Sequence, residues 1–168
     1  MRGYVLIILT LLGLTCGAPA GAAEPLPMPK GRVILTITGA IAQMNAPGEA
    51  RFDREMIEAL GAASITTSSA WTDGVQLFEG VPLKAVLDRV GAAGTSMTAS
   101  ALNEYEIVIP FEDLKFSPLL AMKADGRVLT IRDKGPLWIV YPRDDYEELR
   151  DNRYESRWVW QLNRLHVE

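Results

Sequence analysis

The sequence predicts a single α+β domain built mostly from β-strands, preceded by a short export segment. Short runs of β-branched and aromatic residues outnumber the helical patterns. These runs do not alternate with helices as they would in a doubly wound parallel sheet. The chain has 168 residues, of which 48% are hydrophobic, and this length fits one domain with a substantial core. The sequence contains no internal repeat.

Residues 1–22 have the pattern of a cleavable signal peptide. Arg2 supplies the positive charge, an apolar run follows over residues 5–14, and small residues then satisfy the A-x-A cleavage rule twice. We expect cleavage near Ala22 or Ala23 and export to the periplasm. The apolar run is shorter than the roughly 20 residues that a membrane span needs, but an uncleaved N-terminal anchor remains an alternative.

Cys16 is the only cysteine of the chain and lies within this segment. A lipoprotein signal would place a small residue directly before the cysteine and usually a leucine three positions before it. Thr15 and Gly13 match that pattern poorly, so lipidation is the less favoured alternative. Cleavage after Cys16 leaves a mature chain without cysteine, which excludes disulfides, thiolate metal sites and cysteine nucleophiles.

The charge pattern narrows the class of partner. The formal net charge is −4, and the lysines and arginines form no cluster, which argues against nucleic-acid binding. The single histidine, His166, argues against histidine-based zinc sites and against a serine-histidine-aspartate triad that uses several histidines. Its alternation with apolar neighbours favours a surface position on a strand.

We assign residues 32–168 to the domain and residues 23–31 to an extended leader, because prolines recur at positions 25, 27 and 29. Asp53 is a suitable N-cap for a short helix that Gly61 closes. The elements expected in this first part are a strand over 33–38, a turn over 45–48, a helix over 54–60 and a strand over 65–69.

The clearest helix of the chain opens at Pro82. Proline suits the first helical turn, and apolar residues then recur at helical spacing until Gly91. Asp125-Gly126 is a strong hairpin turn, and Pro142 ends a short buried strand. The elements expected here are strands over 97–102, 106–109, 119–123, 128–132, 137–141 and 157–167, a short helix over 111–114, and a loop or helical turn over 144–152.

Several local patterns follow one another in a recognisable order. They are Trp71, the segment 78–83 that runs into the helix, Asn103-Glu104-Tyr105 before a strand ending at Pro110, Leu120-Ala121 before Asp125-Gly126, the segment 135–142, and Trp158-Val159. This order resembles the oxidoreductase molybdopterin-binding domain, the sulfite oxidase fold, over residues 32–167. No single pattern is specific, and the resemblance rests on the ordered set. It implies a mostly β, α+β fold of the sulfite oxidase type.

Two positions depart from the catalytic members of that family. Those members bind molybdenum through a cysteine thiolate a few residues before the tryptophan that matches Trp71, a position that falls here at about Thr67. A hydroxyl is no substitute for a soft thiolate on a high-valent metal. The arginine of the family's G-x-P-x-R-x-x-x-P loop is replaced by Trp138. An indole face suits a flat heterocycle, whereas an arginine suits an anion.

Within the family, the chain is similar to small stand-alone periplasmic pterin-binding proteins that act with membrane-bound enzymes of cyclic-di-GMP synthesis and degradation. The similarity rests on the length, the signal peptide, the missing cysteine and the segment 135–142. It implies a non-enzymatic sensor, a monomer when alone, that binds a pterin without molybdenum and docks on the periplasmic domain of a membrane-bound signalling protein. Alternatives are a molybdopterin-dependent oxidoreductase, or a subunit of one, and an adaptor that has lost its ligand.

The aromatic candidates for the implied pocket are Trp71 and Trp138. Core packing is the alternative for each of them. Asn103 and Tyr105 lie at a strand junction, where polar residues can point into a cleft. The alternatives are a turn asparagine with its hydrogen bonds satisfied and a half-buried tyrosine.

Four further residues complete the candidate set. The carboxylate of Asp133 suits the amino-pyrimidine edge of a pterin, with a solvated loop as the alternative. Thr67 and Ser68 either line the vacated metal position or form a plain strand end. Tyr141 belongs to the same apolar segment as Trp138.

Two other groups are assigned to structure or to the surface. Trp158 and Trp160 are expected to pack on one face of the last strand. The acidic residues over 144–148 do not have the spacing of a calcium-binding EF-hand loop. They are expected to form a solvated face or a partner-docking patch.

Overall fold

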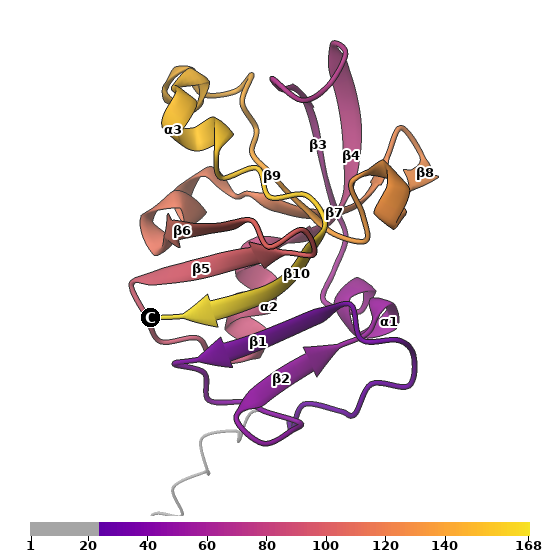
Figure 1. Ribbon diagram of the computed structural model, residues 1–168, viewed down its shortest axis with the longest axis vertical. Helices are drawn as coiled ribbons and strands as arrows, with labels where there is room; N and C mark the ends of the chain where they lie inside the picture. Colours follow the sequence, from indigo (N-terminus) through magenta and orange to yellow (C-terminus); the bar gives the residue numbers. More distant parts are fainter. Residues whose placement is uncertain (1–23) are drawn as a thin grey trace, which may run out of the picture.

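Two β-sheets form the framework of residues 24–168, the part of the chain that the computed structural model describes (Figure 1). The predicted signal peptide over residues 1–22 lies outside the described residues. The α+β class with mostly β-structure, expected from the sequence, is confirmed by ten strands and only short helices among the described residues. Within residues 24–168, no helix has both the length and the apolar character needed to cross a lipid bilayer.

The first sheet joins the two ends of the domain. Its five strands lie in the order β2-β1-β10-β5-β6. The first and last strands, β1 and β10, are parallel neighbours, and the other pairs are antiparallel. The bounds are β1 Leu35–Gly39, β2 Glu49–Phe52, β5 Ser96–Ala101, β6 Glu106–Pro110 and β10 Leu162–Val167.

The second sheet carries a hairpin, β3–β4, that rises above the first sheet in Figure 1. β4 pairs with β7, and both β8 and β9 pair with β7. The bounds are β3 Ala63–Ser68, β4 Val75–Pro82, β7 Leu119–Ala124, β8 Arg127–Val128 and β9 Trp138–Val140.

Short helices cover and connect the sheets. The expected amphipathic helix is α2, which lies behind the first sheet in Figure 1 and buries Leu83, Val86 and Leu87. The carboxylate of Asp53 caps α1 by accepting a hydrogen bond from the Met56 amide, 2.9 Å away, as predicted. The bounds are α1 Arg54–Glu58, α2 Leu83–Arg89 and α3 Asn152–Glu155, with 3₁₀ turns η1 Phe111–Phe116, η2 Ile131–Asp133 and η3 Glu147–Arg150.

The described part of the leader, residues 24–31, packs on the domain although it contains no helix or strand. Leu26 is buried, and the Asp53 carboxylate accepts hydrogen bonds from the amides of Lys30 (2.7 Å) and Gly31 (2.8 Å). The hydrogen bond from Gly31 is the main reason that the pKa of Asp53 is lowered. The N-cap of α1 therefore also holds the leader in place.

Two expected elements in the second sheet differ from the structure. Gly80–Pro82, expected to open the helix, instead end the unpredicted strand β4 and pair with β7. A Cβ at Gly80 would collide with the Leu120 carbonyl oxygen, so this close pairing requires glycine. The strand expected over 128–132 ends at Val128, because the chain turns into η2 soon afterwards.

The last strand is also shorter than expected. It begins at Leu162 rather than at position 157, because Gln161 has a φ of 53°, in the left-handed region that interrupts extended backbone. Trp158 and Trp160 therefore lie in an irregular segment before the strand, and the expectation that they share one strand face was wrong. This irregular segment contributes to the candidate site.

Candidate functional site

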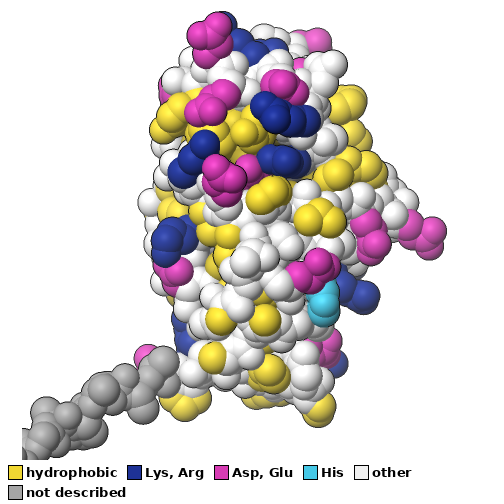
Figure 2. All heavy atoms as spheres, turned by 90° about the vertical axis from the view of Figure 1, so that its left-hand side faces the viewer, with side chains coloured by type: hydrophobic (Ala, Val, Ile, Leu, Met, Phe, Trp, Pro, Cys, Tyr) yellow, Lys and Arg dark blue, Asp and Glu magenta, His cyan; other side chains and the backbone are white. Residues whose placement is uncertain are grey.

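A pocket walled by tryptophans lies between the end of β5 and α3, and we call it the tryptophan pocket. Its volume is about 440 Å³, within the range of small-molecule sites. Figure 2 views the side of the molecule on which α3 lies, and charged side chains of both signs surround apolar ones at its upper end. The lining residues are Trp71, Ala101, Asn103, Tyr105, Asn152, Glu155, Ser156, Trp158 and Trp160.

The aromatic walls meet at a steep angle. The rings of Trp71 and Trp160 are 5.0 Å apart with an interplanar angle of 69°. Trp71 is 42% exposed, whereas Trp158 is only 2% exposed and contacts the rings of Phe78 and Trp138 edge-on. The pocket therefore combines an open indole surface with a floor that belongs to the packed aromatic core.

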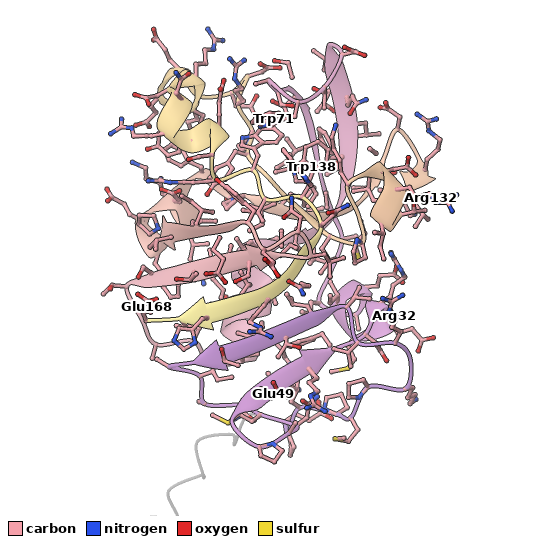
Figure 3. All side chains as sticks on the ribbon, in the orientation of Figure 1. Arg32, Glu49, Trp71, Arg132, Trp138 and Glu168 are labelled. Atoms are coloured by element: carbon pink, nitrogen blue, oxygen red, sulfur yellow. The ribbon has the colours of Figure 1, made fainter. Side chains whose placement is uncertain are left out.

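The loop that presents Trp71 joins β3 to β4 and is held by hydrogen bonds. The Trp71 amide donates to Ser69 Oγ (3.1 Å), and the hydroxyls of Ser69 and Thr72 are 3.0 Å apart. From the other side, Lys134 Nζ donates to the Trp71 carbonyl oxygen at 2.7 Å. These contacts hold the backbone of Trp71, whose side chain is exposed. Figure 3 shows Trp71 and Trp138 at the upper end of the molecule, with Arg132 apart beside β8.

Asn103 and Tyr105 form the rim nearest β5 and β6. Asn103 Oδ1 accepts a hydrogen bond from the Tyr105 amide (3.1 Å), which closes the turn between the two strands. The Tyr105 hydroxyl crosses to donate to the Ser156 carbonyl oxygen at 2.8 Å. The two residues thus both complete the turn and line the pocket, so the two interpretations of them are compatible.

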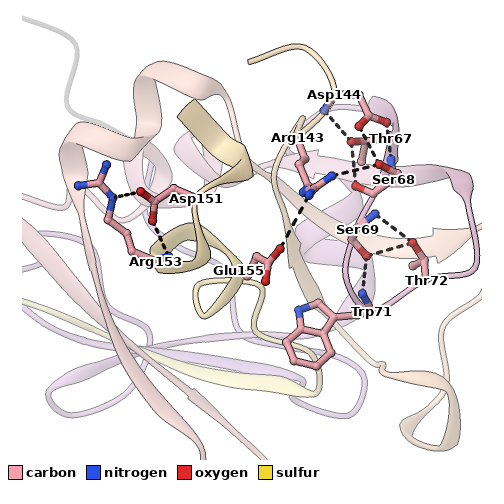
Figure 4. A network of polar contacts seen from close by, with 10 residues as sticks. All are labelled: Thr67, Ser68, Ser69, Trp71, Thr72, Arg143, Asp144, Asp151, Arg153 and Glu155. Atoms are coloured by element: carbon pink, nitrogen blue, oxygen red, sulfur yellow. Dashed lines mark hydrogen bonds and ion pairs between the residues drawn. The ribbon is translucent and has the colours of Figure 1, made fainter. Parts of the chain in front are cut away.

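A polar network connects the pocket with Thr67 and Ser68, where the resemblance places the metal ligand of the catalytic family members (Figure 4). Arg143 lies between Glu155, at 3.9 Å, and Ser68 Oγ, at 3.5 Å. The Asp144 carboxylate accepts hydrogen bonds from the amide (2.6 Å) and the hydroxyl (2.7 Å) of Ser68. These bonds lower the pKa of Asp144. Ser68 therefore lies beside the pocket and contacts it through Arg143.

Thr67 does not provide a metal ligand. It is fully buried, its hydroxyl donates to the Ser68 carbonyl oxygen (3.2 Å), and it accepts a hydrogen bond from the Asp144 amide (3.2 Å). Within residues 24–168, no three histidine, cysteine, aspartate or glutamate side chains gather as a metal-binding group. This set of donors does not fit a high-valent molybdenum ion, which needs a soft ligand here.

Trp138 and Asp133 line a different hollow, which we call the basic pocket. Its volume is about 380 Å³, and Arg127, Arg132 and Lys134 provide its positive charge. Trp138 is only 1% exposed, and Lys134 Nζ lies 5.0 Å from its ring centroid. Asp133 accepts a hydrogen bond from Thr130 (2.7 Å). The structure therefore does not bring Asp133 and Trp138 together with Trp71 in one pocket.

Tyr141 lies in the core behind the tryptophan pocket. It is fully buried, and its hydroxyl donates to Asp113 at 2.9 Å. Arg157 binds both oxygens of the same carboxylate, at 2.8 and 2.7 Å. Burial, reinforced by the Asp113 charge, raises the pKa of Tyr141 well above its ordinary value. Its position is structural, and it does not line the pocket.

Sequence reasoning did not place Trp158, Trp160 or Glu155 at the pocket. The packing expected for the two tryptophans is confirmed, since Trp158 is buried and Trp160 packs against the core, but both also line the pocket. The four tryptophans of the short chain were the available signal, since an excess of indoles is typical of a ligand surface. No local pattern marked Glu155, because Trp71 and residues 101–105, which line the same pocket, come from distant parts of the chain.

No protein-family model matches the chain, and no curated protein matches it. Among solved structures, the chain is similar to the sulfane dehydrogenase SoxCD from Paracoccus pantotrophus, with a TM-score of 0.60 and 19% sequence identity. The match covers 79% of this chain and 37% of that chain, so the present chain corresponds to little more than a third of SoxCD's matched chain. This similarity shows the fold alone: a mostly β domain that matches a sulfite-oxidase-like fold, as the sequence resemblance implied.

Proposed function

We propose that the protein binds a reduced pterin, without molybdenum, in the tryptophan pocket. The observation that supports this most directly is the exposed indole of Trp71, held by a braced loop in the pocket that the buried Trp158 also lines. Flat heterocycles stack on indole faces. The polar side chains of the pocket provide the hydrogen-bonding groups that orient such a ligand.

The proposed role is to relay ligand occupancy to the periplasmic domain of a membrane-bound enzyme of cyclic-di-GMP control. Such a relay requires that ligand and partner each change the affinity for the other. The Trp71 loop is a suitable element, because Lys134 connects it to the basic pocket on a neighbouring surface. A ligand that stacks on Trp71 would then bias the arrangement of residues outside its own pocket.

The similarity to a sulfane dehydrogenase favours a second candidate, a molybdopterin-dependent oxidoreductase or a subunit of one. The buried hydroxyl of Thr67 argues against it, because no thiolate occupies the expected metal-ligand position. A ligand-free adaptor is the third candidate. The size and aromatic lining of the pocket argue against that adaptor. Exposed apolar surface of this kind is typical of a binding site.

The deciding experiment uses protein purified gently from the periplasm of its own host. The sample is denatured, the released small molecules are oxidised, and pterin is quantified by fluorescence chromatography while molybdenum is measured by elemental analysis. Stoichiometric simple pterin without molybdenum supports the sensor. Molybdenum with a dithiolene pterin supports the oxidoreductase. If neither is present and reduced pterins do not bind in a titration, the pterin proposal fails.

A further inference from the structure

We infer that Glu155 determines which heterocycle the tryptophan pocket accepts, by binding the 2-amino-4-oxo edge of a pterin. This inference rests on the proposed function and deepens it. The sequence had suggested Asp133 for this task, but Asp133 lines the basic pocket. Glu155 provides the same chemical group in the pocket that has the exposed indole.

Glu155 is the only charged side chain among the described residues that line the tryptophan pocket. It is the last residue of α3, and its side chain is 25% exposed. The other polar groups of the pocket are neutral, and the Tyr105 hydroxyl already donates to a backbone carbonyl oxygen. A ligand with hydrogen-bond donors therefore has one acceptor that is both charged and partly shielded from water.

Arg143 orients the Glu155 carboxylate but makes no hydrogen bond to it. Its guanidinium approaches Oε1 of Glu155 at 3.9 Å, which is too long for a hydrogen bond. Arg143 also lies 3.5 Å from Ser68 Oγ, and Asp144 holds Ser68 in turn. Figure 4 shows Glu155 directed toward Arg143, with the Trp71 indole, which lines the same pocket, below them in this view. Arg143 is thus a positioning residue for the Glu155 carboxylate.

The geometry points to a ligand that presents two adjacent N–H donors in the plane of its ring. An ionised carboxylate only accepts hydrogen bonds, and it binds paired donors through its two oxygens. The 2-amino group and the N3–H of a pterin form such a pair. In a lumazine a carbonyl oxygen replaces the amino group, so an acceptor faces the carboxylate instead. The pocket should therefore bind lumazines more weakly than pterins.

The test compares 6-hydroxymethyl-tetrahydropterin with the matching tetrahydrolumazine, titrated anaerobically into purified, ligand-free protein. We expect the wild type to bind the pterin about ten- to a hundredfold more tightly, the range expected for losing hydrogen bonds to a charged group. Glu155→Gln should lower the affinity for the pterin by a similar factor and remove most of the preference. It should leave the affinity for the lumazine within a few-fold of that of the wild type, which shows that the pocket remains intact.

Asp133→Asn is the matched control, because it removes a carboxylate from the other pocket, and it should change neither affinity. If both heterocycles bind with equal affinity, or if Glu155→Gln keeps the preference, the role of Glu155 is overturned while pterin binding stands. The same role is overturned if Asp133→Asn abolishes the preference. If neither heterocycle binds to the wild type, the proposed function fails together with the inference.

Discussion

The tryptophan pocket and the basic pocket have similar volumes, about 440 and 380 Å³, but they are assembled in opposite ways. Apart from Gln76, the basic pocket is lined by the contiguous stretch 124–138, and its arginines are exposed. The tryptophan pocket draws on three separate stretches, around 71, over 101–105 and over 152–160. Long-range contacts between these stretches determine its shape.

This difference in assembly indicates that the tryptophan pocket is the better preformed of the two. The exposed arginines of the basic pocket, Arg127 and Arg132, can change rotamers at little cost, so they favour solvation or a loosely defined partner. The indoles of the tryptophan pocket are held by segments from different parts of the chain. Less conformational entropy is therefore lost when a ligand binds to them. The two pockets are connected, because Trp138 packs against Trp158 (6.0 Å between ring centroids) and Lys134 binds the Trp71 backbone.

The largest expected effect tests the shared core. Trp138→Ala should lower the free energy of unfolding by about 3–5 kcal/mol, because it leaves a large cavity behind both pockets. Arg132→Ala, on the exposed side of the basic pocket, should change it by less than about 0.5 kcal/mol. Urea unfolding followed by tryptophan fluorescence and circular dichroism measures both values. Equal effects would show that Trp138 is not a core residue. Trp138→Phe, a milder change, provides a measurable value if Trp138→Ala does not fold.

The next effect separates ligand binding from stability. Trp71→Ala should weaken the binding of a reduced pterin by about ten- to a hundredfold, as expected when a stacking surface worth about 1–3 kcal/mol is lost. Because Trp71 is 42% exposed, the free energy of unfolding should change little. Calorimetric titration and urea unfolding of the same sample check the two statements. A strong loss of stability would instead assign Trp71 to the core.

Local patterns predicted much of the fold. The N-cap at Asp53, the amphipathic spacing of α2 and the hairpin turn at Asp125-Gly126 depend on residues close in the sequence, and the structure contains all three. The strand β4 was missed because its Gly80–Pro82 end resembles the start of a helix. Its pairing with β7, which lies about 40 residues further along the chain, decides its conformation, and no local pattern reports such pairing.

The candidate site could be predicted only in part, for the same reason. Trp71, Asn103 and Tyr105 were singled out, and they do line one pocket. Asp133 and Tyr141 were grouped with them by their place in the sequence, but Asp133 lies in the turn η2 at the basic pocket, and Tyr141 is buried. The resemblance could identify the segments that surround a pocket. It could not tell which side of each segment faces it.

A smaller effect concerns the network beside the tryptophan pocket and its dependence on pH. The hydrogen bonds from Ser68 lower the pKa of Asp144, so the folded chain binds this proton less readily than the unfolded chain. The stabilisation is therefore complete above about pH 5 and is lost as the pH falls through the lowered pKa. Asp144→Asn should cost less than about 1 kcal/mol at pH 7, because the group is exposed.

Urea unfolding at several pH values between 7 and 3 checks this prediction. The difference between the wild type and Asp144→Asn should shrink as the solution becomes more acidic. Asp145→Asn is the matched control, since Asp145 is the neighbouring carboxylate and is also exposed. A difference that stays constant down to pH 3 would show that the charge of Asp144 does not contribute, and that the substitution acts through packing alone.

The smallest effect tests the connection between the two pockets. Lys134→Met removes the hydrogen bond to the Trp71 carbonyl oxygen but keeps most of the aliphatic side chain that covers the Trp138 ring. We expect the free energy of unfolding to change by a few tenths of a kcal/mol and the affinity for a reduced pterin to fall about two- to fivefold, because the Trp71 loop loses one of its restraints.

Arg127→Met is the matched control, since it removes a positive charge from the same pocket at a residue with no hydrogen bond to this loop in the described structure. If both substitutions weaken binding equally, the effect arises from the charge of the basic pocket and the contact with Trp71 does not connect the two sites. If only Lys134→Met weakens binding, the hydrogen bond to the Trp71 carbonyl oxygen is the contact through which the basic pocket affects the tryptophan pocket.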